Sequence, residues 1–172
     1  MTAPHDKQSQ ADIQASIVRA VAGDVSGTTD GGWGDREWVH LFVDFELDHD
    51  SGRSSSISFA LARRPGASLE KIAFRLSPET KQAFADLADA VHTPGRQSWS
   101  AVQVRVEADG RYNFEFSYAP PYRLGGKLND TRFSDYLDAW RQGVDGARSA
   151  APEGKDVAAR SKRGWWRTLF GQ

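Results

Sequence analysis

Residues 99–118 read WSAVQVRVEADGRYNFEFSY, and this stretch decides the fold. Valines alternate with polar residues in its first half, and aromatic residues alternate with polar residues in its second half. A period of two places successive side chains on opposite faces of a β-strand. Asp109 and Gly110 separate the halves and suit the positive φ angles of a tight turn. The stretch therefore predicts a β-hairpin with one apolar, aromatic face that other parts of the chain must cover.

Three further alternating stretches precede the hairpin. Residues 36–48 are predicted to form the longest strand, residues 55–63 a second strand and residues 69–76 a third. Short polar turns rich in Gly, Ser and Pro separate them. Runs of this kind joined by short turns are typical of an antiparallel meander.

Three helices are predicted around these strands. The first covers residues 9–22 and carries a stripe of aliphatic residues. The second begins after Ser77, which suits an N-cap position, and ends before Pro94. The third is expected to begin at Asp130 and to run to about Val144. The order predicts an α+β fold with a five-stranded antiparallel sheet, made of the three-strand meander and the C-terminal hairpin. Two or three helices are expected to cover one face of that sheet.

The length of 172 residues fits one domain with additional terminal segments. Residues 1–8 are expected to be disordered, and residues 9–145 to form a single α+β domain. Residues 146–163 are small, polar and basic, which is typical of a flexible linker. Residues 164–172 are predicted to form an aromatic and basic interaction tail.

Composition excludes several classes of protein. The absence of cysteine excludes disulfides, thiolate metal sites and a cysteine nucleophile. No N-terminal leader and no apolar run of about 18 residues is found, so we expect a cytoplasmic protein. Residues 151–172 hold five basic and two acidic residues, whereas the rest holds 17 basic and 21 acidic residues. This mildly acidic body is not expected to bind nucleic acid.

The predicted strand at residues 36–48 has two contrasting faces. The face that runs from Val39 to Leu47 is aliphatic and aromatic, and we expect it to face the core. The other face begins with aromatic side chains and ends with carboxylates, and we assign it as a candidate partner-binding surface. Its members are Trp38, His40, Phe42, Asp44, Glu46 and Asp48.

We expect the acidic end of this face to lie at the solvent-facing edge of the strand. A row of carboxylates can also bind a divalent cation or act as an acid and base pair. A third interpretation is an acidic stripe that meets a basic patch on a protein partner. No nucleophile motif accompanies the row, and no two histidines have a metal-binding spacing. We therefore predict a protein without catalytic residues, metal or cofactor.

The C-terminal tail, GWWRTLFGQ, is the strongest local signal for an interaction. As a helix it would place its large apolar side chains on one face, with basic residues beside them. The candidate contact residues are Trp165, Trp166, Arg167, Leu169 and Phe170. Docking onto the domain, or onto a second copy of the chain, is one interpretation. The others are a groove on a partner protein and an anionic membrane surface, which one short helical turn would bind only weakly.

From Leu76 to Trp140 the chain resembles the YezG-like (EsaG-like) immunity proteins, a bacterial antitoxin family. The resemblance rests on a helix ahead of Trp99, the alternating strand that follows, the Asp109-Gly110 turn and the aromatic strand ending at Tyr118. A terminal helix with Tyr136 and Trp140 completes it, and the order of elements matches over residues 10–145. The Gly-rich residues 23–34 and the tryptophan-containing tail depart from the family pattern.

The resemblance implies a cytoplasmic protein that neutralises a secreted toxin by occluding it. The toxin domain in this family is often a nuclease, and a basic one would suit the acidic body. The family has no catalytic residues to transfer to this chain. The alternative is an adaptor or secretion chaperone whose C-terminal GWWRTLFGQ tail docks a partner or a membrane surface. A second alternative is an enzyme that uses the row of Asp44, Glu46 and Asp48.

Overall fold

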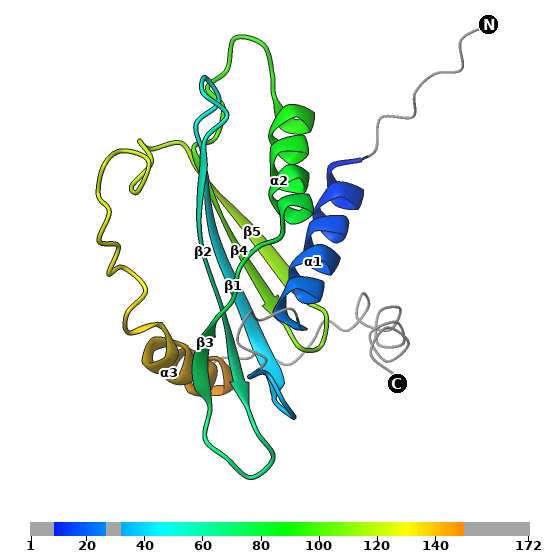
Figure 1. Ribbon diagram of the computed structural model, residues 1–172, viewed down its shortest axis with the longest axis vertical. Coiled ribbons are helices and arrows are strands. Elements are labelled where there is room, and N and C mark those ends of the chain that lie inside the picture. Colours follow the sequence, from blue (N-terminus) through cyan, green and yellow to red (C-terminus); the bar gives the residue numbers. More distant parts are fainter. Residues whose placement is uncertain (1–8, 27–31, 150–172) are drawn as a thin grey trace, which may run out of the picture.

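The computed structural model describes residues 9–26 and 32–149. In chain order the elements are α1 (Gln10–Ser26), β1 (Glu37–Leu47), β2 (Ser54–Arg63), β3 (Glu70–Ala73), α2 (Pro78–Val91), β4 (Ala101–Glu107), β5 (Tyr112–Ser117) and α3 (Tyr136–Ser149). The strands form one sheet in the order β3-β2-β1-β4-β5, and every neighbouring pair is antiparallel (Figure 1). The predicted α+β fold with a five-stranded antiparallel sheet is confirmed.

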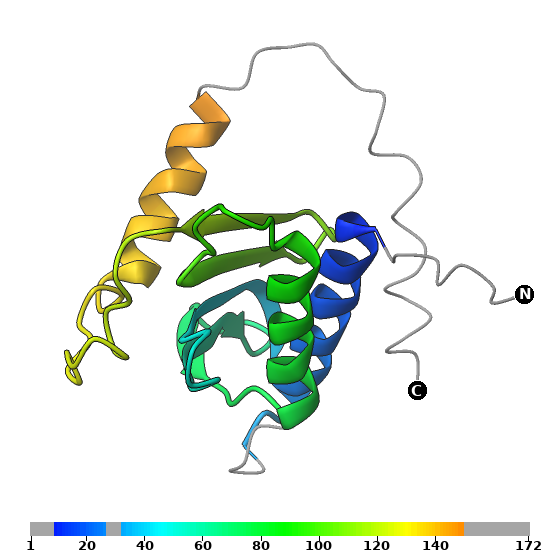
Figure 2. The same ribbon diagram turned by 90° about the horizontal axis from the view of Figure 1, so that it is seen from above.

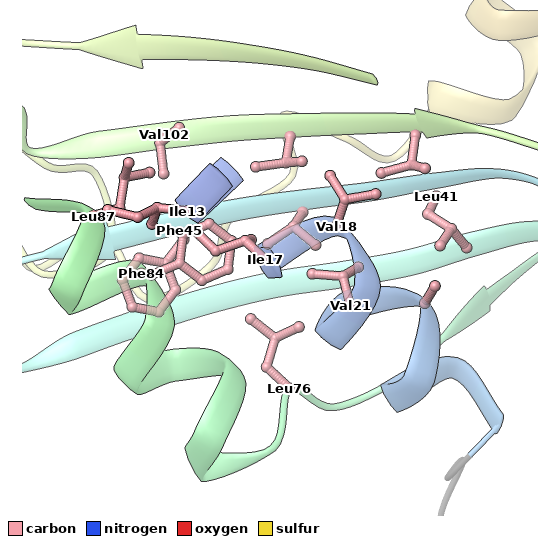
Figure 3. Packing of buried hydrophobic residues seen from close by; sticks show 14 of the residues in the cluster. Ile13, Ile17, Val18, Val21, Leu41, Phe45, Leu76, Phe84, Leu87 and Val102 are labelled. Atoms are coloured by element: carbon pink, nitrogen blue, oxygen red, sulfur yellow. The ribbon is translucent and has the colours of Figure 1, made fainter. Parts of the chain in front are cut away.

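The main core lies between the sheet and the helix pair α1 and α2 (Figure 3). Ile17 of α1 and Phe84 of α2 are fully buried there, and the Phe84 ring stacks on Phe45 of β1 at a centroid distance of 4.5 Å. Ser77 caps α2 as predicted, because its hydroxyl accepts the Thr80 amide at 3.2 Å. Burial of these aliphatic and aromatic side chains is the main source of stability for this face of the sheet.

Helices cover both faces of the sheet, and the expectation that they cover only one face is wrong. Figure 2 shows α1 and α2 on one side of the strands and α3 on the other. On the α3 side, Phe42, Phe59 and Leu61 form a second buried cluster. The α3 residues Tyr136 and Trp140 pack against this cluster. An amphipathic helix settles there because β1 and β2 expose apolar side chains on both faces.

A β-bulge in β1 changes the face assignment at its start. The pairing of β1 with β2 shifts between Trp38 and His40. One extra residue reverses the alternation on one side of a bulge. Trp38 therefore packs against the main core and Val39 against the second cluster, the reverse of the predicted faces.

The last helix begins later and ends later than predicted. α3 starts at Tyr136, and the Asp130 carboxylate, expected to cap it, is instead bound by arginine side chains. It runs to Ser149 and so includes the first residues of the predicted linker. The remainder of that linker, residues 1–8 and the tail 164–172 lie outside the described residues. No helix among the described residues is long and apolar enough to cross a membrane.

Candidate functional site: a loop anchored by buried charges

The two central carboxylates of the candidate surface are buried. Asp44 and Glu46 are each 1% exposed, so the expectation that they lie at a solvent-facing edge is wrong. The segment that covers them is residues 119–135, which connects β5 to α3 and is called the anchored loop below. The two carboxylates do lie on the face of β1 that points away from the main core, as predicted. The groups that bind them, however, belong to this chain and not to a partner protein.

Glu46 binds the backbone of the anchored loop directly. Its Oε1 accepts the amides of Tyr122 and Arg123, both at 3.0 Å, and its Oε2 accepts the amide of Leu124 at 2.9 Å. Three consecutive backbone N–H groups thus converge on one carboxylate. Hydrogen bonds to a charged acceptor contribute about 1.5–3 kcal/mol each, so this clamp fixes the loop to β1.

Arg123 is the central cation of the network, with a side chain only 9% exposed. Its Nη1 lies 2.8 Å from Asp44 Oδ1 and 2.8 Å from Asp130 Oδ2. Its Nη2 donates to the Asp44 carbonyl at 3.0 Å, and its Nε donates to Ser55 Oγ at 2.9 Å. The guanidinium fork therefore joins β1, β2 and the loop at one point.

The contact to Asp44 Oδ1 is an ion pair by distance but lacks hydrogen-bond geometry. The other oxygen of this carboxylate, Oδ2, accepts the side-chain amide of Gln103 at 3.1 Å.

Arg132 and Asp130 close the network toward solvent. Arg132 Nη2 lies 2.6 Å from Asp130 Oδ2, and its guanidinium carbon lies 4.2 Å from the centroid of the Tyr122 ring. The hydrogen bond from Arg132 holds the pKa of Asp130 well below its ordinary value. The network contains three carboxylates and two arginines. The third negative charge is stabilised by the backbone N–H groups that bind Glu46.

Two glycines allow the loop to turn sharply under this network. A side chain at Gly125 would collide with the carbonyl oxygen of Pro121. Gly126 adopts a φ of +104°, which L side chains rarely reach. The turn that aligns the three amides on Glu46 therefore depends on glycine at both positions.

The most exposed large apolar side chains of the described residues lie in the anchored loop and immediately before it. Leu128 is 89% exposed and Tyr118 is 54% exposed. Between the loop and the β4–β5 hairpin lies a hollow of about 280 Å³. Glu115 and Gln103 line it on the sheet side, and Pro121 lines it on the loop side. The loop thus forms one wall of a polar hollow and separately exposes Leu128, which does not line the hollow.

A second polar contact fixes α3 to the sheet. His40 is 1% exposed, with Nδ1 at 2.9 Å from Glu107 Oε1 and Nε2 at 2.8 Å from the Tyr136 hydroxyl. Burial raises the pKa of Tyr136. The ring of Trp140 lies 5.7 Å from that of His40. The arrangement orders the start of α3 beside the anchored loop.

The six residues predicted as one surface do not form one. His40, Phe42, Asp44 and Glu46 are buried under α3 and the anchored loop. Asp48 instead stabilises the turn after β1, because its carboxylate accepts the Ser51 hydroxyl at 2.6 Å, and this hydrogen bond lowers the pKa of Asp48. A partner contact by these residues remains a prediction, and for the buried four it requires the covering segments to move.

The enzyme alternative gains no geometric support from the row of carboxylates. Arginine and backbone groups occupy Asp44 and Glu46, and Asp48 is engaged in its own turn. Within residues 9–26 and 32–149 no three His, Cys, Asp or Glu side chains are arranged to hold a metal ion. The candidate tail residues Trp165, Trp166, Arg167, Leu169 and Phe170 lie outside these ranges.

Sequence reasoning missed Arg123, Asp130 and Arg132, which complete the site. They lie more than 75 residues beyond Asp44 and Glu46 in the chain, and no spacing rule connects them. Comparison of the chain with models of known families and with curated proteins found no match.

Proposed function

We propose that this chain is a non-catalytic binding protein, and that it acts as an immunity protein which occludes a secreted bacterial toxin. The observation that carries the proposal is the anchored loop. A network of buried charges ties a surface segment to the sheet, and this segment carries Leu128, the most exposed large apolar side chain of the described residues.

Buried ion networks add little net stability, because desolvation offsets the attraction between the charges. In some proteins such networks instead specify one conformation. A loop that is ordered before binding loses less entropy when it contacts a partner. An exposed apolar side chain on such a loop suits an anchor that inserts into a pocket of the partner. An occluding protein needs this kind of preformed surface.

The test is partner capture from the source organism with the full chain and two matched variants. Leu128→Asp places a charge on the anchored loop, and Ala67→Asp places the same charge on the exposed turn between β2 and β3. We expect Leu128→Asp to lose the partner and Ala67→Asp to retain it. The captured protein should arrest growth when expressed alone and not when expressed with this chain.

The adaptor alternative predicts a different pattern. The full-length variant Trp165→Ala/Trp166→Ala would then lose the partner, and Leu128→Asp would keep it. A partner with no toxic effect would contradict the immunity function, even if the anchored loop binds it.

A further inference from the structure

The strand β5 is an open edge of the sheet among the described residues. Its only β neighbour there is β4, and Figure 2 shows the β4–β5 hairpin at the margin of the sheet away from β3. Edge strands expose a row of backbone N–H and C=O groups, and natural proteins usually protect them with Lys, Pro, a bulge or a cover. The sequence YNFEFS of β5 contains no Lys or Pro, and its register with β4 is continuous. Its one charged side chain, Glu115, is paired with Arg105 of β4 at 3.0 Å.

The opposite edge of the sheet is protected. β3 has only four residues, Glu70–Ala73. The side chain of Lys71 donates to the carbonyls of Phe133 and Ser134 at 2.8 and 3.2 Å, which joins the edge to the segment that leads into α3. The short strand and the Lys71 contacts hinder pairing of this edge with another strand.

The ladder geometry shows which groups of β5 point outward. Glu107 of β4 donates its amide to the carbonyl of Arg111 at 2.8 Å, so these two residues form a hydrogen-bonded pair. In an antiparallel ladder every second pair is of this kind. The pairs Arg105 with Asn113 and Gln103 with Glu115 therefore direct their backbone groups inward. The amide and carbonyl groups of Phe114 and Phe116 point outward.

We infer that β5 is the interface between two copies of this chain, which pair antiparallel about a twofold axis at Phe114. The outward amide of Phe114 then donates to the carbonyl of Phe114 in the second copy, and the reverse bond forms by symmetry. The half-buried rings of Phe114 and Phe116 lie beside those of the second copy and extend the aromatic face of the sheet. The inference goes beyond the proposed function and does not depend on it.

Side-chain charge selects this register. Residues opposite one another must lie on the same face, so the axis passes through a residue and not between two. An axis at Glu115 would allow the same number of backbone hydrogen bonds per turn of the ladder, but it would place two carboxylates opposite each other. An axis at Phe114 places the amide of Asn113 opposite the carboxylate of Glu115 in the second copy, twice. An axis at Phe116 would involve Tyr118, whose carbonyl already accepts Gln97 at 2.7 Å.

Amide hydrogen exchange of the full chain, measured by NMR over a dilution series, tests the inference. The amides of Asn113 and Glu115 should be protected at every concentration, because they bond to β4. The amide of Phe114 should be protected under conditions in which the chain sediments as a dimer and should lose this protection on dilution below the Kd. Rapid exchange of this amide in the dimer would refute the pairing. Protection of this amide in a chain that sediments as a monomer would assign the edge to another segment of this chain and would also refute it.

Two charge variants at the exposed Asn113 provide a second test, because they should change the dimer Kd in opposite directions. Asn113→Lys should tighten the dimer and Asn113→Glu should weaken it, because each faces Glu115 of the second copy. Two symmetric cross-strand contacts together change the dimer Kd by about twofold to thirtyfold. Asn113→Glu/Glu115→Lys should restore dimerisation. The matched variants Gln82→Lys and Gln82→Glu on α2 should leave the Kd unchanged. Sedimentation in which both Asn113 variants shift the Kd in the same direction, or not at all, would overturn the register.

Discussion

The substitution Glu46→Gln tests whether the carboxylate anchors the loop. Glutamine keeps the shape of the side chain but replaces one acceptor oxygen with an NH₂ donor. If the glutamine oxygen takes the place of Oε1, the hydrogen bonds from Tyr122 and Arg123 are kept. The new NH₂ group then faces the amide of Leu124, and two donors oppose each other with no acceptor between them. The substitution would also remove the negative charge 3.7 Å from both Arg123 Nη1 and Arg132 Nη2. Breaking a buried charged pair costs about 3–5 kcal/mol. The free energy of unfolding of a whole domain is only about 5–15 kcal/mol.

Thermal unfolding provides the measurement. For a chain of 150–250 residues each kcal/mol lowers Tm by about 2–4 °C, so Glu46→Gln should lower it by about 6–20 °C. The control is Glu70→Gln, because Glu70 also pairs with an arginine, at 2.9 Å, but its side chain is 45% exposed and lies outside the inferred dimer interface. An exposed pair contributes less than about 1 kcal/mol. Equal Tm values for the two variants would refute the argument that Glu46 holds the loop.

Three further substitutions probe the turn, the solvent-side ion pair and the α3 contact. Gly125→Ala should lower Tm by several degrees and release the loop, measured by limited proteolysis, because the new methyl group collides with the Pro121 carbonyl. Asp130 takes up a proton in the unfolded chain near its ordinary pKa of about 3.9 but at lower pH in the folded protein. The free energy of unfolding should therefore fall as the pH drops below about 4, and Asp130→Asn should reduce this fall in urea titrations. Tyr136→Phe leaves a ring nitrogen of buried His40 without its partner and should cost about 1–3 kcal/mol in the same assay.

Matched controls define what would contradict these predictions. Gly143→Ala lies in α3 with no atom near the added methyl group, so it should stabilise by up to about 1 kcal/mol. Tyr118→Phe, at an exposed ring, and Asp138→Asn, at an exposed carboxylate, should have little effect. Each argument fails if the buried substitution behaves like its exposed control.

The fold could be predicted because alternation along the strands is a local property. The hairpin at residues 99–118 and the cap at Ser77 were both evident from neighbouring residues. The bulge between Trp38 and His40 was not, because it depends on pairing with β2. The side of the sheet occupied by α3 was also not evident, since a helical stripe specifies an apolar neighbour and not which neighbour.

The site could be predicted only in part. Asp44 and Glu46 were conspicuous because carboxylates followed aromatic residues on one strand face. Their burial depended on Arg123 and Arg132, which lie in a Pro/Gly-rich segment that local patterns describe only as a loop. Tertiary structure determines whether a carboxylate faces water or an arginine. For this reason the expectation that Asp44 and Glu46 face solvent was wrong.

The distance along the chain between β1 and the anchored loop has a consequence for biosynthesis. The bonds that join them link residues 76 to 79 positions apart. At about 5–20 residues per second, the ribosome synthesises this interval in about 4–16 s. During that time Phe42 and Phe59 have no cover from α3, and the nascent chain carries an apolar, strand-rich face that favours aggregation. A chain released before residue 119 would keep this face uncovered, so residues 119–149 are required to end the exposure of this face once synthesis is complete.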